Sequence, residues 1–191
     1  MSTERIIVDV TVAEAFVAQL ARRAAALPAS LLGPVVDMKT VTRCNALIED
    51  ALAKGARLLA GGLSDSTQMR ATLLDGVTRE MRIWHEESFG PVKSIIRVKD
   101  EAEALAVANE SEYGLSSAIY SRDSARAWNL AQNLQTGICH INGPTVHDEA
   151  QMPFGGCKSS GYGRFGGRAG IAEFTELRWI TLQTVPRELP F

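Results

Sequence analysis

Apolar runs alternate along the chain with longer stretches in which apolar residues recur at helical spacing. The runs are rich in β-branched residues and are bounded by glycine, proline or polar clusters, which is typical of strands. They predict strands over residues 5–10, 56–60, 72–77, 92–98, 117–120, 138–142 and 178–183. The helical spacing predicts helices over residues 11–27, 39–54, 100–109, 123–134 and 170–174.

Strands that alternate with helices indicate an α/β fold, with a mainly parallel, twisted sheet and flanking helices. No internal repeat, low-complexity tract or clear domain boundary interrupts the pattern. The last strand, residues 178–183, differs from the others because Trp179 and Leu182 need a partner surface. We expect it to lie on an edge of the same chain or to extend the sheet of another subunit.

The composition excludes several classes of protein. The 191 residues suffice for one domain with a sizeable core, and 46% hydrophobic and 22% charged residues are ordinary for a soluble globular chain. A net charge of −2 gives no basic field for nucleic acid or an anionic membrane. No apolar run is long enough to span a bilayer, and the N-terminus lacks the apolar core of a signal peptide. We therefore expect a cytoplasmic location, with no nucleic-acid and no membrane partner.

The cysteines and histidines are too scattered to predict a disulfide framework or a metal site. They are Cys44, Cys139, Cys157, His85, His140 and His147. Cys139 and His140 lie in an apolar strand, where we expect a small buried hydrophobe and a hydrogen-bonded core histidine. Cys157 lies in a glycine-rich loop, but no histidine is close to it in sequence, so no catalytic role is predicted. His147, Asp148 and Glu149 could bind a metal, although a solvated loop is favoured.

A glycine-rich stretch, residues 152–164, follows the predicted strand over residues 138–142. Glycine permits positive φ and a close approach of other groups to the backbone. A long loop that leaves a buried strand in an α/β chain is where a binding site is expected. Phe154 favours this interpretation over a mobile surface loop, because a purely solvated loop has little reason to carry a large aromatic side chain.

A second candidate site is the sequence Glu-Glu-Ser-Phe-Gly-Pro over residues 86–91, at the entrance of a predicted strand. Adjacent glutamates most often form a solvated acidic turn. The functional alternative is cofactor contact, since a carboxylate can accept both hydroxyls of a ribose and an aromatic ring can pack on a nicotinamide. Residues 161–166 also fit the dinucleotide fingerprint G-x-G-x-x-G, but a loop precedes them and only a short helix is predicted after them. We interpret this second match as accidental.

Residues 153–164, Pro-Phe-Gly-Gly-Cys-Lys-Ser-Ser-Gly-Tyr-Gly-Arg, resemble the P-F-G-G-x-K-x-S-G-x-G-R signature of the aldehyde dehydrogenase superfamily. The continuation Phe-Gly-Gly is similar to the vanillin, salicylaldehyde and benzaldehyde dehydrogenase branch. Residues 86–92 resemble the E-E-x-F-G-P-V motif of the same family. The resemblance covers the C-terminal part of the family's length. It implies that residues 1–175 are the C-terminal portion of the catalytic domain and residues 176–191 an oligomerisation strand and tail.

In this family a cysteine thiolate attacks an aldehyde, hydride passes to NAD or NADP, and a glutamate activates the water that releases the acid. The resemblance implies that Glu87 holds the nicotinamide ribose, that Phe89 lies against the nicotinamide ring, and that Phe154 lines the substrate tunnel. Residues 143–151 would line the mouth of that tunnel. The implied substrate is an aromatic aldehyde, and the choice between NAD and NADP stays open.

The resemblance also implies that part of the catalytic machinery is missing. Residues 1–6 resemble the segment immediately after the nucleophile, so that cysteine would sit just before Met1. The general-base glutamate, the asparagine of the oxyanion hole and most of the Rossmann domain would lie further upstream. A core strand that starts almost at Met1 likewise suggests a chain cut from something longer. We therefore predict a fragment that is inactive alone. The alternative is a catalytically dead assembly module, whose strand 178–183 joins subunits into a homo-oligomer.

Overall fold

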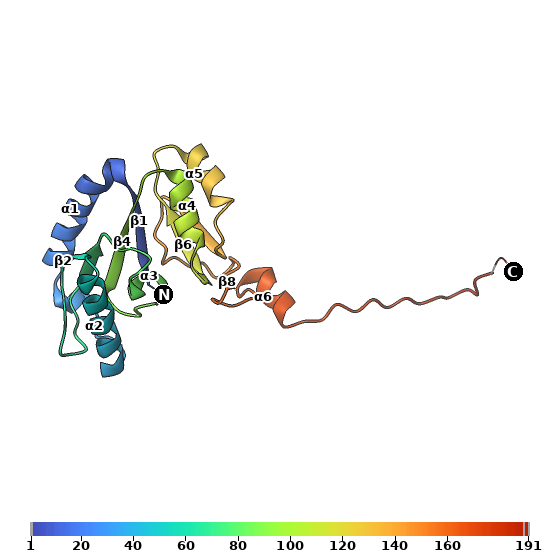
Figure 1. Ribbon diagram of the computed structural model, residues 1–191. Coiled ribbons are helices and arrows are strands. Elements are labelled where there is room, and N and C mark those ends of the chain that lie inside the picture. The colour runs from blue at the N-terminus through green and yellow to red at the C-terminus, as the bar shows by residue number, and fades with distance from the viewer. Residues whose placement is uncertain (1, 189, 191) are drawn as a thin grey trace.

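The computed structural model describes residues 2–188 and 190. Its strands are β1 (Arg5–Asp9), β2 (Arg57–Ala60), β3 (Thr72–Asp75), β4 (Val92–Val98), β5 (Tyr113–Gly114), β6 (Ser116–Ile119), β7 (Ile138–Ile141) and β8 (Cys157–Lys158). Its helices are α1 (Val10–Ala26), α2 (Met38–Ala53), α3 (Arg82–His85), α4 (Glu101–Asn109), α5 (Ser124–Ala131) and α6 (Gly167–Glu173), with a 3-10 turn at Ala29–Leu31. Helices and strands gather in one body, and the C-terminal segment runs away from it (Figure 1).

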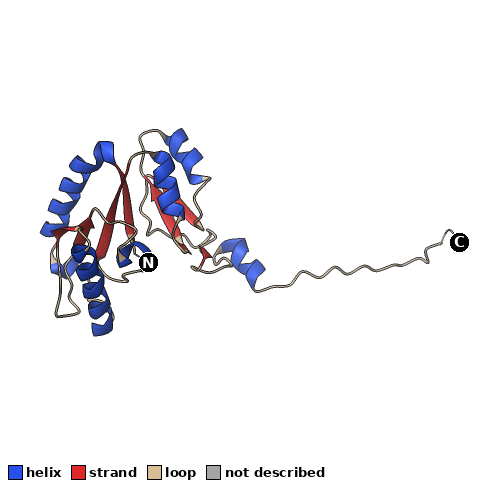
Figure 2. Ribbon diagram, viewed as in Figure 1, coloured by secondary structure: helices blue, strands red, loops and turns tan. Residues whose placement is uncertain are grey.

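The main sheet has four strands in the order β1-β4-β3-β2. β4 is parallel to both β1 and β3, whereas β2 is antiparallel to β3. A second parallel pair is formed by β6 and β7, and a short antiparallel pair by β5 and β8. Figure 2 shows these strands among their helices. The predicted α/β class with a mainly parallel sheet is confirmed, and β2 is the antiparallel exception within the main sheet.

The main sheet is covered on both faces because its inner strands are apolar at consecutive positions. Successive side chains of a strand point to opposite faces. Leu74 and Ile96 therefore join the cluster that includes Leu47 of α2, whereas Leu73 and Ile95 join the cluster that includes residues of α1. This two-sided core fixes β4, and with it the turn that enters β4.

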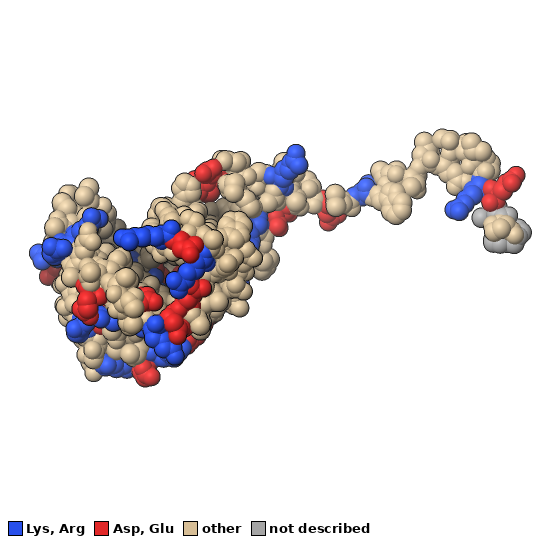
Figure 3. Space-filling model, turned by 90° about the horizontal axis from the view of Figure 1, so that it is seen from above, with Lys and Arg blue, Asp and Glu red and all other residues tan. Residues whose placement is uncertain are grey.

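Basic and acidic side chains are intermingled on the face that Figure 3 shows, with no large area of one sign. Among residues 2–188, no helix is long and apolar enough to cross a membrane.

The strand predicted over residues 178–183 is not formed within the described chain, so its placement on an edge of the same chain is wrong, and its pairing with another subunit stays a prediction. Residues 175–188 follow an extended path outside every sheet (Figure 2). A strand exists only when a neighbour accepts and donates its backbone hydrogen bonds. The side chains of Trp179 and Leu182 are 90% and 85% exposed. Among the described residues, no surface covers these two side chains. Met1, Leu189 and Phe191, which belong to the segments predicted over residues 1–175 and 176–191, lie outside the described residues.

Candidate cofactor and substrate site

The turn between α3 and β4, residues 86–91, contains both Glu87 and Phe89. Ser88 and Gly90 are buried, Glu87 is half-buried, and the Phe89 side chain is 68% exposed. Phe89 has a φ of 49°, which is uncommon for a residue with a bulky side chain and is kept only where neighbours enforce it. The turn thus carries a half-buried carboxylate at Glu87 and an exposed aromatic ring at Phe89, and the contact of both with a cofactor stays a prediction.

Helix α2 holds this turn from one side. Arg43 donates from Nε and Nη2 to the Ser88 carbonyl oxygen at 3.2 and 2.9 Å, and its guanidinium lies 5.6 Å from the centre of the Phe89 ring. The Cys44 sulfur lies 3.4 Å from the same carbonyl oxygen. A Cβ on Gly90 would come within 2.5 Å of that sulfur, so only glycine allows the turn to pack this closely against α2.

The N-terminal segment holds the turn from the other side. The Glu4 carboxylate accepts hydrogen bonds from the Ser88 amide at 3.1 Å, the Ser88 hydroxyl at 2.8 Å and the Phe89 amide at 3.3 Å. Sequence reasoning missed both Glu4 and Arg43. Neither belongs to a motif, and they reach Ser88 from 84 and 45 residues away.

The electrostatic setting of the turn favours the neutral form of Glu87. Burial raises the pKa of Glu87, and the negative charges of Glu4 and Glu112 raise it further, while Arg43 opposes the shift. Burial also lowers the pKa of Lys93, against the attraction of Glu4. At a given pH, the charge of the Glu87 carboxylate therefore depends on its burial and on the neighbouring charges of Glu4, Glu112 and Arg43.

Phe154 lies in the predicted glycine-rich loop, which is hydrogen-bonded to itself. Its amide and carbonyl pair with those of Phe165, both at 2.8 Å. Arg164 donates from Nη1 to the carbonyl oxygens of Gly156 and Gly163, both at 2.7 Å. The Phe154 side chain is half-buried, so the loop presents its aromatic residue from a fixed backbone rather than as a solvated tip.

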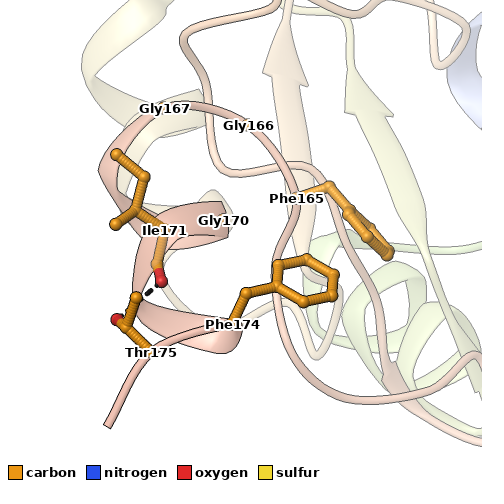
Figure 4. Close-up of a pocket in the computed structure, with 7 residues that line it drawn as sticks. All are labelled: Phe165, Gly166, Gly167, Gly170, Ile171, Phe174 and Thr175. Carbon is orange, nitrogen blue, oxygen red and sulfur yellow. Dashed lines mark hydrogen bonds between the residues drawn. The ribbon is translucent and has the colours of Figure 1, made fainter.

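An apolar cavity of about 540 Å³ adjoins this loop on α6 (Figure 4). Its lining residues are Phe165, Gly166, Gly167, Gly170, Ile171, Phe174 and Thr175. The rings of Phe165 and Phe174 lie 6.2 Å apart. None of the lining side chains can act as an acid or a base, so this cavity offers apolar contact and no chemistry of its own.

The loop after β7 contains His147, whose Nε2 lies 3.2 Å from Glu149, and whose ring meets that of His140 edge-on at 5.4 Å. The expectation of a hydrogen-bonded core histidine at position 140 is wrong. His140 is half-buried, and its buried Nε2 has no hydrogen-bond partner among the described residues. Within the same residues no group of three possible ligands surrounds a metal position.

Comparison with known proteins identifies the family. Residues 1–180 match the aldehyde dehydrogenase family. This chain belongs to the aldehyde dehydrogenase family. The resemblance carried by residues 86–92 and 153–164 is thereby confirmed.

Two relatives confirm the branch that the sequence indicates. The chain is 59% identical to the vanillin dehydrogenase of Pseudomonas fluorescens over 197 aligned residues, which cover all of this chain. It superposes on the crystal structure of a salicylaldehyde dehydrogenase from Pseudomonas putida G7, complexed with salicylaldehyde, with a TM-score of 0.94, 44% identity and 98% of this chain covered. An NADP complex of a glyceraldehyde-3-phosphate dehydrogenase from Bacillus halodurans C-125 matches over 92% of this chain with a TM-score of 0.86 and 38% identity.

The match covers only part of each of these aldehyde dehydrogenase relatives. This chain spans 41% of the vanillin dehydrogenase, 40% of the salicylaldehyde dehydrogenase and 38% of the NADP-bound enzyme. The roles of Glu87, Phe89 and Phe154 toward cofactor and substrate stay predictions.

Proposed function

We propose that this chain is the C-terminal part of the catalytic domain of an NAD(P)-dependent aldehyde dehydrogenase that oxidises aromatic aldehydes to carboxylic acids. The observation that carries the proposal is the turn of residues 86–91, which α2 and the N-terminal segment hold with Glu87 half-buried and the Phe89 ring exposed. Family membership and the NADP bound to a solved relative support it.

The residues of the turn fit a nicotinamide cofactor. The Glu87 carboxylate has two oxygens that can accept both hydroxyls of a ribose, and the exposed Phe89 ring can pack on a flat ring. When bound, the cofactor supplies the hydride acceptor of the oxidation. The part played by this chain is to hold the ribose, orient the ring and exclude water from one side of it.

In this proposal the nucleophilic cysteine comes from outside the chain. Burial raises the pKa of the Cys44 thiol, which disfavours the reactive thiolate. The sulfur atoms of Cys44 and Cys157 contact backbone carbonyl oxygens rather than an imidazole or a carboxylate. Neither is therefore activated as a nucleophile, and the chain is proposed to be inactive on its own.

Aromatic aldehydes are the proposed substrates because relatives that are 59% and 44% identical to this chain are named vanillin dehydrogenase and salicylaldehyde dehydrogenase. Phe154, fixed by its backbone pairing with Phe165, supplies an aromatic wall for such a substrate. In the proposal, residues 143–151 line the mouth of the substrate tunnel.

The test is formation of reduced cofactor from vanillin, salicylaldehyde or benzaldehyde, measured on this chain alone and after the remaining N-terminal part of a relative is supplied. We expect activity only after complementation. In the complemented protein, Glu87→Gln should raise the KM for the cofactor about tenfold, as loss of hydrogen bonds to a charged acceptor predicts. The matched control is Glu86→Gln, because Glu86 is paired with Arg82 on the surface. Cysteine-dependent activity of the chain alone, or none after complementation, would contradict the proposal.

A second candidate function, a catalytically dead assembly module, is favoured by the extended C-terminal segment. Residues 175–188 expose large apolar side chains outside every sheet of the described chain, among them Leu177, Trp179, Ile180 and Leu182. Such a segment can add a strand to another subunit. In sedimentation, Trp179→Glu should then dissociate the oligomer, whereas Trp128→Glu, which also alters an exposed tryptophan, should not. A monomeric parent chain would exclude this function.

A further inference from the structure

We propose that Glu4 is a positioning residue, which fixes Glu87 and Phe89 for the cofactor by accepting hydrogen bonds from the backbone of the turn between them. The inference rests on the proposed function, since it concerns the same turn. It assigns a role to a residue outside both family motifs that the sequence presents.

The Glu4 carboxylate faces the backbone of the turn rather than only solvent. Its two oxygens take three donors from two consecutive residues, the amide and hydroxyl of Ser88 and the amide of Phe89. Ser88 is fully buried, so its amide cannot turn to water if the carboxylate is removed, whereas its hydroxyl can also donate to the carbonyl oxygen of Gly90 or Val92, at 3.1 and 3.2 Å. Hydrogen bonds from backbone amides to an ionised acceptor are among the stronger ones in proteins.

These hydrogen bonds from Ser88 and Phe89 to Glu4 lie where the backbone of the turn adopts an uncommon conformation. Phe89 has a φ of 49°, in a region that a residue with a bulky side chain occupies only when its surroundings enforce it. Glu4 accepts from the Phe89 amide and from the Ser88 amide before it, while Arg43 holds the Ser88 carbonyl oxygen from the opposite side. Without Glu4, neither amide keeps its acceptor, and within the described residues the backbone on the N-terminal side of Phe89 is held only through the Ser88 carbonyl oxygen and hydroxyl.

A second link joins the same two segments. Lys93, the second residue of β4, donates from Nζ to the Ser2 hydroxyl at 2.7 Å and to the Gly90 carbonyl oxygen at 2.9 Å. Its ammonium also lies 4.0 Å from the Glu4 carboxylate. Ser2 and Glu4 lie two residues apart, so their side chains leave the segment on the same side, Ser2 toward Lys93 and Glu4 toward the turn. Displacement of residues 2–4 is therefore passed to the turn, and movement of the turn to residues 2–4.

The first test is hydrogen exchange, residue by residue, on the 191-residue chain. In Glu4→Gln, one carboxylate oxygen becomes a donor that faces other donors, so the Ser88 and Phe89 amides should exchange about tenfold faster. The amides of β3 and β4 should change less than twofold. Glu49→Gln, on an exposed position of α2, removes the same charge and should change neither set.

The pattern of exchange separates positioning from a general structural role. Equal acceleration of all amides, or no change at Ser88 and Phe89, would overturn the inference. If Glu4→Gln does not fold, Glu4→Asp serves the same test, because its shorter side chain cannot reach both amides. Failure of both variants to fold would assign Glu4 to folding and would likewise overturn it.

A second arm uses the complemented enzyme. There Glu4→Gln should raise the KM for the cofactor about tenfold and leave the KM for the aldehyde unchanged. If the parent protein is active and the KM of the variant for the cofactor is unchanged, the inference on Glu4 is wrong while the proposed function stands. If the parent protein is inactive, the proposed function fails, and the exchange of Ser88 and Phe89 still decides whether Glu4 holds the turn.

Discussion

The hydroxyl oxygens of Thr3 and Thr145 lie 2.6 Å apart, although 142 residues separate them in the sequence. Thr3 stands between Ser2, which contacts Lys93 of β4, and Glu4, which contacts the turn of residues 86–91, so its side chain leaves the segment on the other side. The Thr145 carbonyl oxygen also accepts a hydrogen bond from the Ser116 hydroxyl at 2.7 Å. The N-terminal segment thus connects the proposed cofactor turn to the loop after β7.

Removal of the Thr145 hydroxyl should loosen this loop without unfolding the chain. Thr145→Val deletes one neutral hydrogen bond, worth about 1 kcal/mol, so amides of residues 143–147 should exchange about fivefold faster. The matched control is Thr42→Val, which deletes the hydroxyl that donates to the Met38 carbonyl oxygen on α2. If the amides of residues 143–147 exchange no faster in the Thr145 variant than in the parent chain, the contact does not order the loop.

Asp75, the last residue of the inner strand β3, is a fully buried carboxylate between two arginines. Arg57 donates to it at 2.5 Å, and Arg97 donates at 3.0 and 2.9 Å. Burial alone would raise the pKa of Asp75, but the hydrogen bonds from Arg97 and Arg57 outweigh burial and hold the pKa below its usual value. The ionised form therefore stabilises the fold above the pKa of an unfolded aspartate, and this stabilisation is lost as the pH falls through the folded-state pKa.

Asp75→Asn should destabilise the chain by about 3 kcal/mol at neutral pH, because it removes the buried carboxylate with which both Arg97 and Arg57 pair. Urea unfolding at neutral and acid pH provides the measurement. The difference between parent and variant should shrink in acid, where the parent carboxylate is protonated. Glu14→Gln, which alters the exposed partner of Arg97, should change the free energy of unfolding by less than about 0.5 kcal/mol. Equal effects of the two variants would contradict this account.

The sequence alone predicts those parts of the fold and of the site that are determined by residues close together along the chain. β3 and β4 are short β-branched and apolar runs, and Glu87 and Phe89 lie in one motif, so local pattern suffices for them. The antiparallel direction of β2 could not be predicted, because it depends on which strand edge is free. Arg43 and Glu4 could not be predicted either, because only the fold brings α2 and the N-terminal segment to Ser88.

Gly137, just before β7, provides a test of how the glycine-rich loop is packed. A Cβ at this position would lie 1.9 Å from the Gly155 carbonyl oxygen, and backbone cannot move aside cheaply. Gly137→Ala should therefore lower the free energy of unfolding by about 2 kcal/mol or displace the loop that carries Phe154. Gly33→Ala, where a Cβ meets nothing within 4 Å, is the control and should be near neutral. A stable Gly137 variant with unchanged exchange in residues 152–166 would show that the loop packs less closely.

Cofactor binding should weaken in acid at a higher pH than an ordinary glutamate would cause. Burial raises the pKa of Glu87, the charges of Glu4 and Glu112 raise it further, and Arg43 opposes them. Only the ionised carboxylate accepts from both ribose hydroxyls, so the affinity is present above this raised pKa and is lost as the pH falls through it. The measurement is the KM for the cofactor against pH in the complemented enzyme.

Two variants make the pH profile specific to Glu87. Glu112→Gln removes one of the negative charges near the Glu87 carboxylate, so the midpoint of the loss should move to lower pH while the affinity at neutral pH is kept. Glu87→Gln cannot titrate, so its weak affinity should be independent of pH over the same range. A midpoint that stays in place in Glu112→Gln, or persists in Glu87→Gln, would mean that another group controls the binding of the cofactor.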